Sequence, residues 1–110
     1  MEDDQNKIFT SVDKAPGFPG GDAAFDIYLK ANIRYPAIAR VNNVQGKVFL
    51  NFVVEKDGSI TDIKVVRGVG SGCDDEAIRV LKSSPNWKPG MQNNRTVRVS
   101  YTMPITFSLQ

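Results

Sequence analysis

The chain has no histidine and a single cysteine among its 110 residues. The absence of histidine excludes the usual Ser-His-Asp triads and metal sites built from imidazole ligands. Cys73 cannot form a disulfide within the chain, so the cysteine content does not decide the redox compartment. Catalytic and metal sites of the common kinds are therefore not expected.

Long apolar runs and an excess of one charge are also missing. No apolar segment approaches the roughly 20 residues of a membrane span, and the start of the chain does not resemble a signal peptide. Fourteen basic and twelve acidic residues give a net charge of +2 without a lysine and arginine cluster, which argues against nucleic acid as a partner. The length predicts one domain. Because residues 1–4 look like a linker end or an expression remnant, we expect a piece of a longer protein.

The most informative segment lies at the C-terminal end, where apolar and polar residues alternate from 97 to 109. Side chains of a strand point to opposite faces with a period of two, so this pattern predicts a long strand with one buried face. The predicted inward residues are Val97, Val99, Tyr101, Met103, Ile105, Phe107 and Leu109. Pro104 cannot donate to a ladder, which favours an edge strand or a bulge. An open edge of this kind can accept a strand from another chain.

Upstream of this strand, the chain divides into an arm and a domain. Residues 1–21 are polar and then rich in proline and glycine, so we expect a linker or arm. The apolar residues expected to dock the arm are Ile8, Phe9, Val12 and Phe18. The domain itself is expected to span residues 22–110.

The domain pattern predicts the order helix, helix, strand, strand, helix, strand. Asp22 is expected to cap the first helix, and Asp57 with Gly58 predicts a hairpin turn. The expected ranges are 22–31 and 36–42 for helices, 47–55 and 60–67 for strands, and a third helix that starts at 74. Together these elements predict an α+β fold, a small antiparallel three-stranded sheet with helices on one face and a long C-terminal edge strand.

Each group that could carry chemistry has a simpler structural interpretation. The carboxylates of residues 74–76 complement the dipole at a helix start. The glycines of residues 68–72 lack the ending of a phosphate-binding loop. Cys73 has no base beside it and is expected to be a small buried residue. Trp87 is expected to anchor the core. We therefore expect no catalytic, cofactor-binding or metal-binding residue. We also expect that the protein is not an enzyme.

From residue 35 onward, turn residues, glycines and inward apolar residues follow one another in a characteristic order. They are Tyr35–Pro36, Ala39, Val44, Gln45, Gly46, Val48, Phe52, Val54, Asp57, Gly58, Val65, Glu76, Ala77, Trp87, Pro89, Gly90, Val97 and Pro104. This set resembles the TonB C-terminal domain family over about residues 35–109. The segment 18–21 and the helix after it look like the extension of Bacteroidetes-type members.

Three positions depart from the family pattern. Cys73 stands where leucine is usual, Asn94 where glycine is frequent and Thr96 where proline is frequent. Cysteine keeps a buried apolar role, and asparagine tolerates left-handed backbone angles. The departures leave the binding strand intact and the loop geometry at 91–96 open.

The resemblance implies the periplasmic domain of an energy transducer from Gram-negative bacteria. In that family an inner-membrane anchor couples to a proton-driven motor of the ExbB–ExbD type, and the C-terminal domain binds outer-membrane receptors. The receptor's extended TonB box adds as a strand to the last strand of the domain. The proton motive force then drives nutrient uptake, and no cofactor takes part.

The expected partner-binding residues lie on the last strand and just before Tyr35. On the strand they are Val97, Arg98, Val99, Ser100, Tyr101, Thr102, Met103, Ile105 and Phe107. The resemblance adds Asn32, Ile33 and Arg34, in a segment that approaches the receptor plug. Tyr35 itself is expected to pack against the last strand. Because strand edges also pair with themselves, we expect concentration-dependent homodimers of the isolated domain.

A second interpretation keeps the fold and changes the role. The domain could be a TonB-like tail of another envelope protein, such as a sensor peptidase, that binds a partner without transducing energy. A membrane anchor and a proline-rich spacer upstream would favour the transducer. The receptor, its substrate and the direction of the added strand do not follow from the sequence.

Overall fold

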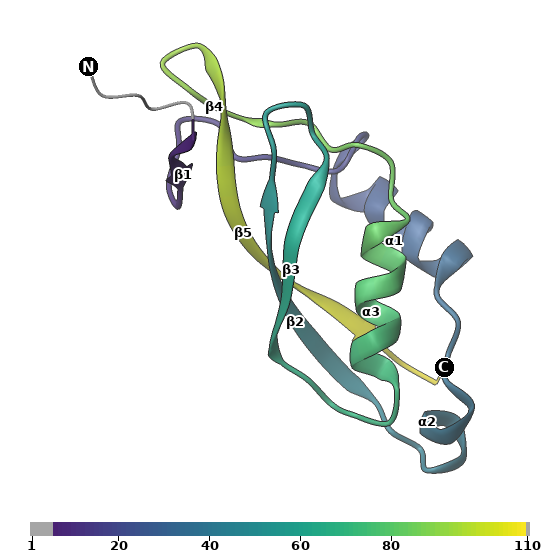
Figure 1. Cartoon of the computed structure of the whole chain (residues 1–110). Coiled ribbons are helices and arrows are strands. Elements are labelled where there is room, and N and C mark those ends of the chain that lie inside the picture. Colours follow the sequence, from purple (N-terminus) through teal and green to yellow (C-terminus); the bar gives the residue numbers. More distant parts are fainter. Residues whose placement is uncertain (1–5, 110) are drawn as a thin grey trace.

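A computed structural model describes residues 6–109, and Figure 1 shows its cartoon. Residues 1–5 of the expected arm and Gln110 of the expected domain lie outside the described residues. In chain order the elements are β1 (Ile8–Phe9), α1 (Gly21–Asn32), α2 (Ala37–Val41), β2 (Gly46–Val54), β3 (Ile60–Arg67), α3 (Cys73–Lys82), β4 (Gly90–Gln92) and β5 (Arg95–Phe107). All predicted helices and strands are present, and their ends shift by up to two residues.

The α+β class is confirmed, but the sheet has five strands rather than the predicted three. Four of them lie in the order β1-β5-β2-β3, and β4 pairs with β5. The antiparallel β2–β5 ladder is continuous from Val54↔Val99 to Gly46↔Phe107. The two additional strands, β1 and β4, are two and three residues long. Segments this short carry no recognisable period, so the sequence pattern could not reveal them.

The last strand is an edge strand over only part of its length. Val97 pairs with Gly90 of β4, and Val99 pairs with Phe9 of β1 on one side and Val54 of β2 on the other. From Tyr101 to Phe107, β5 pairs only with β2 within residues 6–109. The prediction of an edge along the whole strand is therefore wrong for its first half, because the N-terminal segment and β4 fold back onto it.

Helices α1 and α3 lie on one side of the sheet, and the core fills the space between (Figure 1). Alternate residues of β2, from Val48 to Val54, have no exposed surface, as the period of two predicts. On β5 the buried residues Val99, Ile105 and Phe107 belong to the inward set. Cys73 is fully buried, which confirms its structural role.

Trp87 stands at the centre of an aromatic cluster. Its ring centroid lies 5.4 Å from that of Phe52, 5.5 Å from Phe25 and 5.9 Å from Phe18. Only 4% of its surface is exposed, so the predicted core role is confirmed. Phe18, which belongs to the segment before α1, is thereby part of the same core as the sheet.

The start of α1 differs from the prediction. The N-cap is Gly20, with φ 89°, and Asp22 lies in the first turn without a capping hydrogen bond. Gly21 N–H donates to the carbonyl of Phe18, which closes a turn just before the helix. Because glycine adopts positive φ without a steric penalty, the helix begins earlier than a side-chain cap at Asp22 would allow.

Candidate functional site: a free strand edge beside a groove

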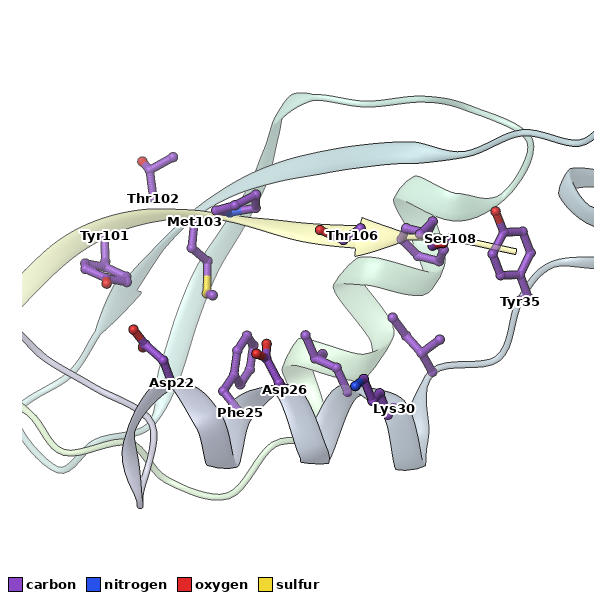
Figure 2. Close-up of a pocket in the computed structure, with 14 residues that line it drawn as sticks. Asp22, Phe25, Asp26, Lys30, Tyr35, Tyr101, Thr102, Met103, Thr106 and Ser108 are labelled. Carbon is purple, nitrogen blue, oxygen red and sulfur yellow. The ribbon is translucent and has the colours of Figure 1, made fainter. Parts of the chain in front are cut away.

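The unpaired half of β5 borders a groove whose other wall is α1. The groove has a cavity volume of about 850 Å³. Figure 2 shows β5 and α1 running alongside each other, with Tyr101 and Met103 directed from the strand toward the helix and Phe25 directed from the helix toward the strand. The groove therefore follows the same stretch of β5 that lacks a second neighbour.

Helix α1 is fixed against the core by aromatic contacts and one hydrogen bond. Phe25 is 5% exposed, and its ring centroid lies 5.0 Å from that of Phe18. Tyr28 Oη donates to the carbonyl of Val80 on α3 at 2.8 Å. Burial raises the pKa of Tyr28, so its hydroxyl stays protonated and remains a donor. The helical wall of the groove is thus held both to the aromatic core and to α3.

Tyr35 closes the far end of the groove. Its ring makes an edge-to-face contact with Phe107 at a centroid distance of 5.7 Å, and its Oη donates to the carbonyl of Val44. The expected packing of Tyr35 against the last strand is therefore confirmed. Burial also raises the pKa of this hydroxyl. Tyr35 ties the chain after α1 to the end of β5.

The expected strand residues fall into two groups. Val97, Arg98 and Val99 pair with β4 or β1, so their backbone is already engaged in the sheet. Arg98 also forms an ion pair with Glu55, with 2.7 Å between Nε and Oε1. The hydrogen bond from Arg98 lowers the pKa of the Glu55 carboxyl. These residues strengthen the covered half of β5.

The second group lies along the unpaired half. Tyr101, Thr102, Met103 and Phe107 line the groove, whereas Ile105 is fully buried in the core. On the outer face, Asn51 Nδ2 donates to Thr102 Oγ1 at 2.8 Å and to Ser100 Oγ at 3.0 Å. These cross-strand bonds hold β5 to β2 and leave the opposite edge open.

The segment before Tyr35 is anchored to α3. Arg34 N–H donates to Glu76 Oε2 at 2.7 Å, and the carbonyl of Asn32 accepts from Arg79 at 2.8 Å. Glu76 and Arg79 also form an ion pair at 2.6 Å. Of the three residues expected here, only Ile33 lines the groove. The side chains of Asn32 and Arg34 are exposed beside it.

The sequence pattern missed the contribution of α1 to this site. Asp22, Phe25, Asp26, Leu29 and Lys30 all line the groove. Their spacing of three and four residues indicates one helix face. The spacing does not tell which strand that face lies against, because the position of α1 depends on contacts far apart in the sequence.

Other kinds of site find no support in the described part of the chain. Residues 6–109 hold no group of three or more cysteine, aspartate or glutamate side chains placed to bind a metal ion. Of the described helices, none has the length and apolar character required to span a bilayer. The acidic residues at the start of α3 have structural partners instead, since Asp74 Oδ1 accepts from the backbone of Val69 at 2.9 Å and of Gly70 at 3.2 Å.

Taken together, the geometry defines a class of protein, namely a mixed helix and sheet domain whose last strand leaves part of one edge open beside a helix. Residues 31–109 match the model of the family described as "Gram-negative bacterial TonB protein C-terminal". This match covers more than half of the chain. The chain therefore belongs to the TonB C-terminal domain family, as the resemblance indicated.

Individual relatives agree with this assignment. Protein TonB of Helicobacter pylori is 33% identical over 83 residues, which are 74% of this chain and 28% of that protein. Protein TonB of Haemophilus influenzae is 32% identical over 79 residues, which are 68% of this chain and 29% of that protein. The chain thus spans less than a third of the length of these relatives.

Solved structures show the same fold. A solution NMR structure of the Helicobacter pylori TonB C-terminal domain aligns with a TM-score of 0.57 and 28% identity, covering 82% of this chain and 97% of that one. A second NMR structure of that domain aligns with a TM-score of 0.60 and 28% identity, covering 84% of this chain and 87% of that one.

Proposed function

We propose that this is the periplasmic receptor-binding domain of a TonB-type energy transducer. It binds the extended TonB box of outer-membrane transporters by adding that segment as a strand to β5. The rest of the protein anchors in the inner membrane and couples to a motor of the ExbB–ExbD type. The domain itself performs no chemistry and transmits force.

The observation that carries this proposal is the coincidence of the unpaired half of β5 with the groove. Within the described residues 6–109, residues 101–107 have one strand neighbour, β2, and they border a cavity of about 850 Å³ on the other side. Backbone hydrogen bonds contribute about 0.5–1.5 kcal/mol each and make few demands on side-chain identity. An edge of this kind allows one transducer to bind the segments of several transporters.

Pro104 sets how far a partner pairs without interruption. The β2–β5 ladder runs through Phe49↔Pro104 in regular register. A proline fits a paired strand when its nitrogen faces the other edge, so we infer that Pro104 faces the open side. The added strand then meets one missing donor in the middle of the edge, with ladder bonds on both sides of it.

Titration of the isotope-labelled domain with a synthetic TonB-box peptide from a candidate transporter tests the proposal. We expect amide shifts that cluster at residues 100–107 and along α1. The control is a peptide of equal length with prolines at alternating central positions, which cannot form the ladder. Shifts confined to residues 68–76, or equal binding of the control peptide, would contradict strand addition.

A further inference from the structure

Helix α1 carries a row of charged residues along the groove. Asp22, Asp26 and Lys30 follow one another at intervals of four residues, which places them on one face of the helix. All three line the groove. In Figure 2, Asp22 projects toward β5 near Tyr101, Asp26 lies between Met103 and Thr106, and Lys30 lies farther along, toward Ser108. The groove is therefore lined by acidic residues from its Tyr101 end to its middle and by a basic residue toward Ser108.

These charges are exposed and free to meet a ligand. The ion pairs formed within residues 6–109 join other residues, on α3 and on the sheet, and none includes Asp22, Asp26 or Lys30. All three residues are exposed to solvent. A charge that lines a groove without an internal partner is available to a charge on whatever binds there.

The floor of the groove is apolar. Leu29 and Met103 are partly buried and pack against the core from opposite walls. Phe25 also lines the groove and is almost fully buried. An added strand would place alternate side chains toward this floor, because its residues point to opposite faces with a period of two.

We infer that α1 selects the segment that adds to β5, an inference that rests on the proposed strand addition. The favoured occupant is an extended peptide with a basic residue at the Tyr101 end, an apolar residue in the middle and an acidic residue at the Ser108 end. Backbone hydrogen bonds to β5 supply most of the affinity, and the charges of Asp22, Asp26 and Lys30 supply the selectivity.

The helix geometry sets the spacing of that pattern. Asp22 and Lys30 are about 12 Å apart along the helix axis, at about 1.5 Å per residue. A strand covers this distance in about four residues, at about 3.3 Å per residue. The favoured peptide therefore has the five-residue pattern basic, any, apolar, any, acidic. The pattern reads in one chain direction if the added strand is parallel to β5 and in the other if it is antiparallel.

This selectivity belongs to the chain's own N-terminal part. The family model begins at residue 31, whereas the charged row lies between Asp22 and Lys30 on α1. The edge of β5 thus lies within the region that the family model matches, and the charged row lies before that region. A partner chosen by α1 would be chosen by this chain and by members that share its helix.

Three peptides of equal length test the inference against the intact domain. The first has Lys-Thr-Val-Thr-Glu at its centre, the second has the reverse order, and the third has glutamine in place of both charged residues. We expect one charged peptide to bind about three- to ten-fold more tightly than the neutral peptide at low salt. The advantage should shrink at high salt, because exposed charges are screened.

Variants then locate the source of the advantage. Asp22→Asn with Asp26→Asn, and separately Lys30→Gln, should each reduce the ratio of charged-peptide to neutral-peptide affinity, and the three substitutions together should bring that ratio to about one. Asp75→Asn is the matched control, since Asp75 is an exposed carboxylate in the first turn of α3 and lies outside the groove. A loss of the advantage in this control as well would overturn the inference.

The amide shifts separate failure of the inference from failure of the proposed function. If all three peptides bind equally and shift residues 101–107, the strand edge accepts partners but α1 does not select them. If no peptide shifts the amide signals of these residues, both the proposed strand addition and the selectivity that rests on it are contradicted. Circular dichroism of each variant verifies that the fold is retained before binding is compared.

Discussion

Replacing Phe25 with alanine gives a direct measure of how firmly α1 is held against the sheet. Phe25 is the buried residue of α1, with 5% of its surface exposed. Its ring centroid lies 5.0 Å from Phe18, 5.5 Å from Trp87 and 6.4 Å from Tyr28. The substitution removes the ring that joins the helix to two aromatic side chains outside it, Phe18 and Trp87, and opens a cavity under the groove.

The expected loss follows from the burial. A buried phenylalanine replaced by alanine lowers the free energy of unfolding by about 3–5 kcal/mol. Because Phe25 lies near the edge of the core, where the helix can settle partly into the cavity, we expect about 3–4 kcal/mol. A domain of this size is stable by about 5–15 kcal/mol in total. The variant should therefore still fold, and it should unfold at a clearly lower urea concentration.

Urea unfolding followed by circular dichroism measures the loss. Ile27→Ala is the matched control on the same helix, because Ile27 is 69% exposed. This control should change the free energy of unfolding by no more than about 0.5 kcal/mol. A loss below about 1 kcal/mol for the Phe25 variant, or an equal loss in the control, would refute the packing of α1 described above.

Three further predictions concern the turn, the buried thiol and the pH dependence. Gly58→Ala should destabilise the domain by at least about 2 kcal/mol in thermal denaturation, since Gly58 has φ +88° and a Cβ there would clash with the Trp87 carbonyl oxygen; Gly70→Ala, with open space around it, should lose less. Burial and the charge of the next residue raise the pKa of the Cys73 thiol, so iodoacetamide should label it only after unfolding, and rapid labelling of the native protein at pH 8 would contradict its burial. Hydrogen bonding to a neighbouring arginine lowers the pKa of Glu55, so its contribution is present above the unfolded value of about 4.3 and is lost as pH falls through the lower folded value. Glu55→Gln should therefore be less stable than the parent at pH 7 and similar to it at pH 2, and a gap that persists at pH 2 would count against the ion pair.

Much of the local structure could be predicted from residue patterns. The alternation along β2 and β5, the Asp57–Gly58 turn and the apolar spacing of α3 each depend on neighbours within a few residues. Their ranges accordingly agree with the structure to within two residues. The cap of α1 was the exception, because Gly20 competes with Asp22 for the helix start and the choice depends on a turn closed at Phe18.

The open edge was only partly predictable. Pro104 correctly indicated that one side of β5 lacks a ladder, since a proline nitrogen cannot donate. The extent of that side depends on β1, which pairs with Arg98 and Val99 from near the start of the chain, and on β4, which forms a hairpin with β5 across Asn93 and Asn94. Both segments are too short to leave a period in the sequence.

By itself, the sequence determined the three helices, the three long strands, the inward faces of β2 and β5 and the membership in the TonB C-terminal domain family, because these depend on residue type and order. Only the tertiary structure decided which half of β5 stays open and which helix faces it. The open half is the part of β5 that β1 and β4 do not cover, and the position of α1 depends on aromatic contacts around Trp87 that join segments about 70 residues apart, from Phe18 to the loop before β4. Packing over that distance positions α1 beside the free edge. The groove exists only because α1 lies there.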